Sequence, residues 1–351
     1  MRPPSTLWRN RRGAADPFGR MHRSHWVIRS VVCGLALGVA LTGANALGQS
    51  DEAVTLARKY HAGQTVVYKA QVSSTAKVES DPPNLKDFFP PVPPNLTLRQ
   101  QNTIKVAAVH EDGAADIEQH FDHFEVQADL AGFPDSLRES TQQAQREFTE
   151  RLTGQTLTVH YDRDGRLTGF EGEDKLLSEI DAPIREPLRQ MLRLFLEQMG
   201  GQALYPDHPV KPGDEWKQSL DAEPRHDYPF QVRGESTLHY SGKTRFQEVD
   251  AGIVDFQFHN VLTPTSTSIR QDGALPELES MGMHLDITIK GEGKGRVLVA
   301  LDDGRVLQNR STLHQTLEAR MQGKEGAAEQ PAKLDIESNT DMDVEGTHPL
   351  P

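Results

Sequence analysis

The chain has 351 residues, with 38 Lys and Arg against 51 Asp and Glu, and a single cysteine. Its formal net charge of −13 argues against nucleic acid and anionic membrane surfaces as partners, because such partners select basic proteins. With one cysteine no intrachain disulfide can form, so stability must come from a packed core.

The N-terminal segment has the pattern of an export signal. An apolar stretch over residues 31–41 follows several arginines and precedes Ala44-Asn45-Ala46. The stretch is shorter than the roughly 20 apolar residues of a membrane-spanning helix. A basic region, a short apolar core and a small-residue cleavage site are typical of a signal peptide. We therefore expect residues 1–46 to be removed and the mature chain to be exported, to a periplasm or outside the cell, without spanning the membrane.

Met21 would open a compact signal, so we expect translation to start there and residues 1–20 to be a mis-assigned upstream start. Residues 1–46 hold seven of the basic residues and one of the acidic ones. The mature chain therefore carries 38 − 7 = 31 basic and 51 − 1 = 50 acidic residues, a net charge of −19. Cys33 leaves with the signal, which excludes thiol catalysis and cysteine-ligated metals.

A polar lead-in over residues 47–62, expected to be frayed, precedes a first unit that spans residues 63–205. Apolar residues alternate from Val66 to Val72, which predicts a strand. Prolines over residues 82–94 predict a loop that carries Phe88 and Phe89. Further strands are predicted over residues 96–109, 115–126, 156–161 and 166–170, with turns at their Asp and Gly residues.

Helices are predicted within this first unit. Apolar residues recur every three or four positions over residues 135–152, which indicates an amphipathic helix. A longer apolar stripe over residues 173–200 is interrupted by Pro183 and Pro187, so we expect one helix up to about residue 181 and another from about 186 to 200.

A turn-rich segment over residues 206–213 is the predicted linker to a second unit over residues 214–346. This second unit is predicted to be almost all strand. Its strands are expected over residues 235–249, 252–262, 283–301, 304–319 and 333–345.

Two hairpins recur in the same order in the two halves. Residues 104–117 parallel residues 245–256, and residues 157–167 parallel residues 298–306. Hairpin turns favour Asp and Gly in any protein, so agreement at the turns alone is weak evidence. The predicted fold class is α+β, mostly antiparallel β, with two duplicated curved-sheet, half-barrel-like units and helices packed on the first.

The strand-turn-strand unit at Val106–Ile117 and the extended element at Pro209–Trp216 resemble an uncharacterised family of secreted bacterial envelope proteins. The layout is also distantly similar to curved-sheet carriers that move lipoproteins or lipids across the periplasm. The resemblance covers most of residues 60–345, rests on structural turns, and implies no functional residues.

The sequence holds little that indicates catalysis or metal binding. His120-Phe121-Asp122-His123 could form a three-ligand site only across a bulge, because alternate strand residues face opposite ways. Residues 291–295 superficially resemble a phosphate loop, but they lie between strands and predict a glycine bend or bulge. We expect no metal, no cofactor and no enzymatic activity; a secreted hydrolase is the less favoured alternative.

Two features could bind a partner. Phe88 and Phe89 in the proline-rich loop could anchor a ligand or fold back onto the core. The apolar stripe on the last predicted helix could line a cavity or simply pack on the sheet. Its residues are Leu188, Met191, Leu192, Phe195 and Met199. We expect an exported, non-catalytic envelope protein with a groove for a lipid, another apolar ligand or an envelope protein. The alternative is a structural or protein-interaction β module without a cavity.

Overall fold

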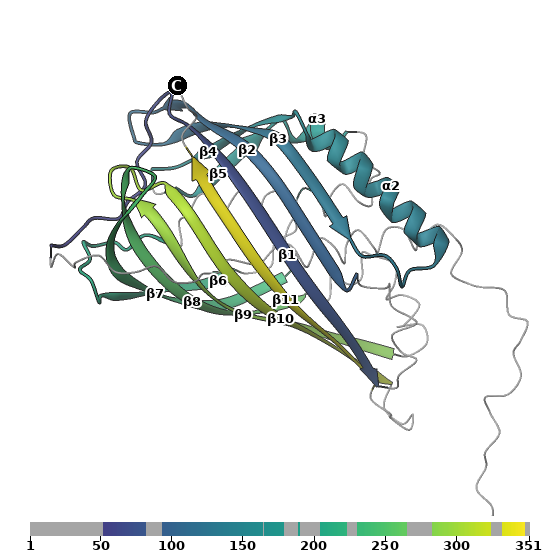
Figure 1. Ribbon diagram of the computed structural model, residues 1–351. Helices are drawn as coiled ribbons and strands as arrows, with labels where there is room; N and C mark the ends of the chain where they lie inside the picture. The colour runs from purple at the N-terminus through teal and green to yellow at the C-terminus, as the bar shows by residue number, and fades with distance from the viewer. Residues whose placement is uncertain are drawn as a thin grey trace, which may run out of the picture.

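The computed structural model describes residues 52–81, 93–163, 165–178, 189, 204–222, 230–264, 283–323 and 332–347. Over these residues the chain forms one eleven-stranded sheet, in which each strand is antiparallel to its neighbours, and two helices (Figure 1). The prediction of a mostly antiparallel β protein is therefore confirmed.

The strands are long, and most exceed the five or six residues of an average strand. Their bounds are β1 Thr65–Asp81, β2 Asn95–Val109, β3 Ala115–Ala128, β4 Thr156–Tyr161, β5 Leu167–Glu171, β6 Glu215–Ala222, β7 Phe230–Phe246, β8 Val249–Pro264, β9 Met283–Ala300, β10 Val306–Gly323 and β11 Ala332–Thr347.

The strand order is β5-β4-β3-β2-β1-β11-β10-β9-β8-β7-β6. The first strand and the last strand thus lie side by side at the centre, in register from Val67 opposite Thr347 to Asp81 opposite Lys333. Strands from the middle of the chain form the two edges. The two predicted units are halves of one continuous sheet, and the boundary over residues 206–213 stays a prediction.

The predicted duplication is not confirmed. The β4–β5 and β9–β10 turns each contain a glycine with positive φ, Gly165 and Gly304. The other proposed parallel is weaker, because Gly113 lies in the β2–β3 turn whereas Gly252 lies inside β8. The β7–β8 turn is made instead by Gln247 and Glu248, so duplication stays a prediction.

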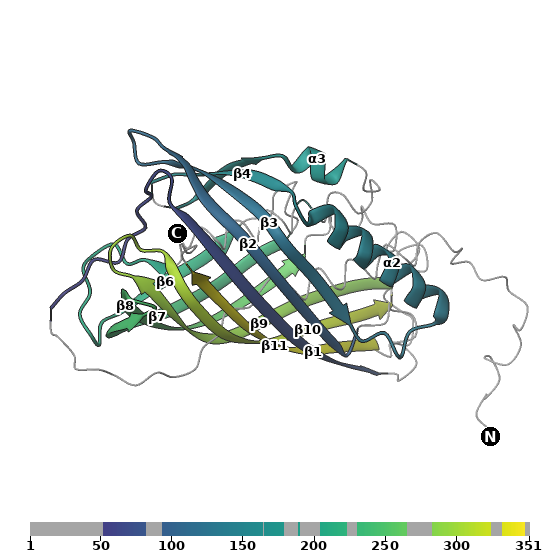
Figure 2. The same cartoon turned by 45° about the horizontal axis from the view of Figure 1, so that its top comes forward.

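The sheet is strongly curved, and its two edges bend toward the same side (Figures 1 and 2). Helix α2, Asp135–Leu152, connects β3 to β4, and helix α3, Glu173–Leu177, follows β5. The ring of Phe148 on α2 meets Phe124 of β3 edge to face, with ring centroids 5.4 Å apart. The predicted helix over residues 186–200 lies outside the described residues, apart from Arg189.

Candidate functional site on the concave face

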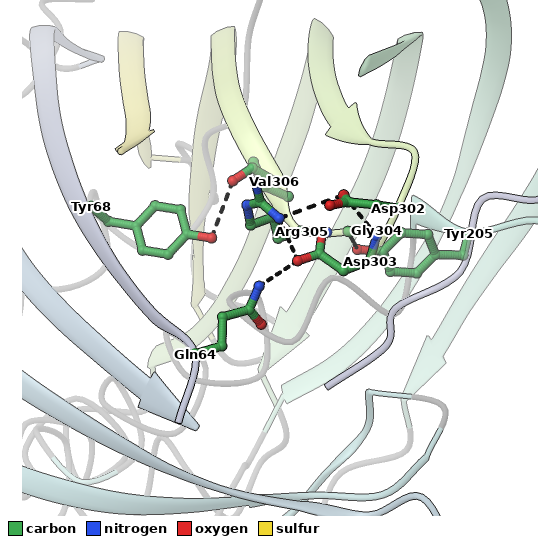
Figure 3. Close-up of polar contacts among 8 residues, drawn as sticks. All are labelled: Gln64, Tyr68, Tyr205, Asp302, Asp303, Gly304, Arg305 and Val306. Carbon is green, nitrogen blue, oxygen red and sulfur yellow. Dashed lines mark hydrogen bonds and ion pairs between the residues drawn. The ribbon is translucent and has the colours of Figure 1, made fainter. Parts of the chain in front are cut away.

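Strand alternation gives the sheet one polar face and one largely apolar face. On β1 the side chains of Val66, Tyr68 and Val72 are buried, whereas Lys69 and Gln71 between them are exposed. Tyr68 points from β1 into the curve toward Val306 (Figure 3), so the apolar face is the concave one. The strand registers extend this division across all eleven strands.

Glycines leave room for aromatic rings on the concave face of β9. Gly293 and Gly295 stand opposite Phe258 and Phe256 of β8. The two rings occupy the space that a side chain at either glycine position would fill. Gly291 likewise accommodates the amide of Asn260. The glycine-rich segment is regular strand, because the β9 register with β8 is unbroken there. The expected bulge is absent from this segment and the expected bend stays a prediction, whereas the glycines make room for side chains of β8.

A row of aliphatic residues crosses the concave face toward the far end of β1. Val78 stands opposite Ile336, Ile336 opposite Leu317, and Leu317 opposite Ile289. All four are only half-buried, in contrast to the fully buried residues near Tyr68. Within the described concave face this aliphatic row therefore keeps some apolar surface exposed, as Ile104, Phe256 and Phe258 also do.

Polar side chains are also buried on the concave face. Asn102, Gln119, Asn260 and Ser311 are 1–5% exposed and come from β2, β3, β8 and β10. Each has a side-chain polar atom without a hydrogen-bond partner. An unsatisfied buried polar group costs about 1–3 kcal/mol, so these atoms favour water or a ligand as a partner.

The N-terminal segment, residues 52–62, closes one end of the concave face. Val54 forms a β-bridge with Val210, in the predicted linker. The Lys59 amide donates to the Asp303 carbonyl at 2.8 Å, and the Gly63 amide just beyond donates to the Val106 carbonyl at 2.8 Å. This closing segment was expected to be frayed, but the three contacts tie it to β2, to the β9–β10 turn and to the second half.

A buried ion pair lies where the closing segment crosses the β9–β10 turn (Figure 3). The carboxylate of Asp303 accepts hydrogen bonds from the Arg305 guanidinium, from the Arg305 amide at 3.0 Å, and from the Gln64 side chain. Burial acts to raise the pKa of Asp303, but these hydrogen bonds outweigh burial and hold the pKa below its usual range.

Two tyrosines complete this buried polar cluster. The Tyr68 hydroxyl donates to the Val306 carbonyl at 3.1 Å, and the Tyr205 hydroxyl donates to the Gly304 carbonyl at 2.5 Å (Figure 3). Burial raises the pKa of both tyrosines, so they stay protonated donors. The cluster therefore connects β1, the β9–β10 turn and the segment before β6.

Arg58 of the closing segment lies beside the cluster. Its guanidinium carbon is 5.2 Å from the ring centroid of Tyr60, and Tyr60 stacks on Tyr161 of β4. Burial acts to lower the pKa of Arg58, but Tyr68, Tyr205, Tyr60 and Asp303 together raise it. Arg58 thus stays charged, half-buried and at the closed end of the apolar face.

The residues predicted to bind a ligand lie outside the described residues. These are Phe88, Phe89, Leu188, Met191, Leu192, Phe195 and Met199. The sequence does not predict the cluster around Asp303, because its members come from three separate segments: Gln64–Tyr68, Tyr205 and Asp302–Val306. The local sequence Asp302-Asp303-Gly304-Arg305 indicates a hairpin turn with acids that are exposed or attract calcium, whereas Asp303 is only 1% exposed.

The bulge that a His120–His123 site would need does exist. In the β2–β3 register Gln101 faces His123 and Asn102 faces Phe121, which leaves Asp122 unpaired. Asp122 accepts a hydrogen bond from Thr103 at 2.8 Å, and its carboxylate lies 3.7 Å from His120. Among the described residues, no three His, Cys, Asp or Glu side chains are grouped to hold a metal.

Neither helix among the described residues is long and apolar enough to cross a membrane. No family model and no curated protein matches the chain. The comparisons with known proteins therefore assign no family.

Two solved structures resemble the chain distantly. A structure titled "Lipid-protein interactions in lipovitellin" matches at 10% identity with a TM-score of 0.39, over 84% of this chain and 26% of that chain. The present chain thus spans about a quarter of the lipovitellin chain's length. The outer membrane protein OprG from Pseudomonas aeruginosa matches at 9% identity with a TM-score of 0.21, over 84% of this chain and 100% of OprG. Scores this low establish neither a shared fold nor a shared function.

Proposed function

We propose that the mature protein is an exported, non-catalytic carrier that holds a lipid or another apolar small molecule on its concave face. The observation that carries this proposal is the largely apolar concave face of one curved sheet, with half-buried aliphatic side chains across its far end. Binding sites for such molecules are concave and mainly apolar, with a few polar groups that orient the ligand.

The buried polar atoms on the same face support a ligand rather than a solid core. A core filled only by protein would leave Asn102, Gln119 and Asn260 with unsatisfied atoms. An amphiphilic ligand, or water held beside it, supplies the missing partners. A structural module without a cavity, the alternative, predicts instead that nothing binds there.

The polar row on the convex face does not have the hydrogen-bond order of a hydrolytic triad. His239, Ser241 and Asp255 lie next to one another on β7 and β8, but the Ser241 hydroxyl donates its hydrogen bond to the Asp255 carboxylate. In a hydrolytic triad the serine donates to the histidine, which in turn donates to the carboxylate. Asp255 is also held by Arg296 at 2.8 and 3.0 Å, which makes the row a structural network.

Native mass spectrometry of the mature protein, purified gently from the envelope of cells that export it, tests the carrier proposal. We expect a mass above that of the polypeptide, which extraction with organic solvent removes and identifies as lipid. A bare polypeptide mass, together with no uptake of added dodecanol by the purified protein, would contradict the proposal.

Matched variants locate the binding surface. Ile289→Asn and Leu317→Asn place an amide in the aliphatic row and should weaken dodecanol binding at least tenfold. Thr288→Asn and Thr316→Asn change the neighbouring residues, which face the convex side, and should leave binding unchanged. Equal effects of the two pairs would place the ligand elsewhere.

A further inference from the structure

The packing pattern between β8 and β9 on the concave face changes chemistry at one position. Phe258 of β8 extends its ring over Gly293 of β9. Two residues further along β8, Asn260 extends its amide in the same way, with its Oδ1 atom 2.5 Å from the position of a Cβ added to Gly291. A polar amide thus takes the place over β9 that an aromatic ring fills one step away.

The Asn260 amide is buried and incompletely hydrogen-bonded. Asn260 is 5% exposed, and its Oδ1 atom has no hydrogen-bond partner. Gln315 of β10 flanks Gly291 from the other side and is 7% exposed, but its amide does not donate to that unpartnered oxygen. An unpaired buried acceptor is costly, and an apolar side chain of similar size would avoid the cost. The Asn260 amide therefore keeps an acceptor for a ligand group, and Gln315 is placed to share that group.

The two amides lie beside the aliphatic row. Gly291 is two residues from Ile289, and Gln315 is two residues from Leu317, a separation of about 7 Å along either strand. From Ile289 to Val78 the row crosses three strand spacings, about 14 Å in all. A hydrocarbon chain with its head at the amides therefore reaches the row and can lie along it.

The surroundings of the amides carry no charge on the concave side. On β1 and on β8 to β11, the strand register places only uncharged residues in the row of the amides, in the aliphatic row and in the row of Phe258. A charged head group would be buried here without an opposite charge, at high cost. A hydroxyl instead supplies a donor for Asn260 and an acceptor for Gln315.

We propose that the Asn260 and Gln315 amides bind the hydroxyl of an uncharged single-chain amphiphile, such as a fatty alcohol or a monoacylglycerol, whose tail lies along the aliphatic row. This inference rests on the proposed carrier function and names its ligand class. The hydroxyl donates to Asn260 Oδ1 and accepts from the Gln315 amide nitrogen. Binding thus pairs the buried acceptor and covers the half-buried apolar side chains of the row.

Direct competition among three probes of matched tail length tests the inference. The mature protein is equilibrated with dodecanol, dodecyl methyl ether and dodecanoate at equal concentrations, below the solubility limit of each. Gas chromatography then measures the probes that stay bound after gel filtration. The ether lacks the hydroxyl donor and the carboxylate is charged, so bound dodecanol should exceed each of them at least tenfold.

Asn260→Leu should lower bound dodecanol at least tenfold, to the level of the ether, whose binding should not change. Gln257→Leu is the matched control, because Gln257 is exposed on the convex face of β8, and it should keep the full preference. If the wild type does not prefer dodecanol, or if Asn260→Leu keeps that preference, the head-group inference is wrong while the carrier function stands. If no probe is retained, both fail.

A measurement on the unaltered protein covers the case in which Asn260→Leu does not fold. Dodecanol with a photoreactive diazirine beside its hydroxyl is bound and irradiated, and peptide mapping by mass spectrometry locates the label. The label should lie on β8, β9 and β10 around Asn260, Gly291 and Gln315. A diazirine at the methyl end of the tail should instead label β11 and β1. Labelling of the same peptides by both probes would overturn the inference.

Discussion

The ring of Phe258 occupies the space above Gly293, so that a Cβ atom added to that glycine would lie 2.5 Å from Phe258 Cε1. In real proteins a Cβ atom does not come this close to a carbon atom to which it is not bonded. A glycine on one strand and an aromatic ring on the next thus form one packing unit, which brings β8 and β9 together on the concave side.

Gly293→Ala should therefore destabilise the protein by about 1–3 kcal/mol, the usual cost of overfilling a packed site. Urea denaturation measures the change. Gly132→Ala is the control, because no atom lies within 4 Å of its added Cβ and its φ is not positive. The double variant with Phe258→Ala should cost less than the sum of its two single variants. Additive costs would show that the two residues do not share this space.

Asp303→Asn should destabilise the protein by about 3–5 kcal/mol, because it removes the nearer and buried one of the two carboxylates that pair with the buried Arg305 guanidinium. Asp302→Asn, at an exposed site beside it, should cost far less. Chemical denaturation of both variants at neutral pH makes the comparison. A small effect at Asp303 would mean that the ion pair is dispensable.

The same ion pair predicts acid sensitivity. The pKa of Asp303 is lowered in the folded protein, so its stabilisation is present above the unfolded value of about 4 and disappears as the pH falls through the folded value. Unfolding free energies between pH 7 and pH 2 should fall more steeply for the wild type than for Asp303→Asn. Parallel curves would contradict this assignment.

The lowered pKa of Asp116, on the convex face, provides a second test by titration. Its carboxylate accepts hydrogen bonds from His160 at 2.7 Å and from His110 at 3.0 Å, and the His160 hydrogen bond is the main cause of its lowered pKa. Nuclear magnetic resonance titration should show the pKa of Asp116 rising toward its ordinary value in His160→Ala. His120→Ala, which removes a histidine bonded instead to Thr156, should leave that pKa unchanged.

The β7–β8 turn should accept stabilising substitutions. Gln247 and Glu248 both have positive φ, which non-glycine residues rarely adopt. Two-residue turns of this shape favour Asn-Gly, so Gln247→Asn combined with Glu248→Gly should raise stability by about 1 kcal/mol. The melting temperature reports the gain. Gly113→Ala, at a φ of 88° in the β2–β3 turn, should act in the opposite direction.

Local patterns predicted much of this fold. The apolar spacing of residues 135–152 predicted α2 with its bounds, and alternation predicted most of the long strands. The far half of β1 was missed because Ser74, Thr75 and Lys77 carry no apolar alternation. Its strand conformation depends on pairing with β2 and β11, which are distant in sequence. Such pairing cannot be read from short-range periodicity.

The candidate site could be predicted only in part. An apolar concave surface was expected, but the sequence pointed to Phe88, Phe89 and a helical stripe that lie outside the described residues. Gln64 and Asp303 are 239 positions apart and meet only because the chain leading into β1 crosses the β9–β10 turn. Contacts between segments this far apart leave no spacing signature in the sequence.

The pairing of β1 with β11 also has a consequence for biosynthesis. The last strand to leave the ribosome occupies the middle of the sheet, so an unfinished chain exposes open edges on both β1 and β10. Contacts across more than 250 residues also slow folding, because the chain must close a large loop before it gains them. During that interval the nascent protein needs protection from self-association, and premature termination before β11 should yield an aggregating fragment rather than a shorter folded protein.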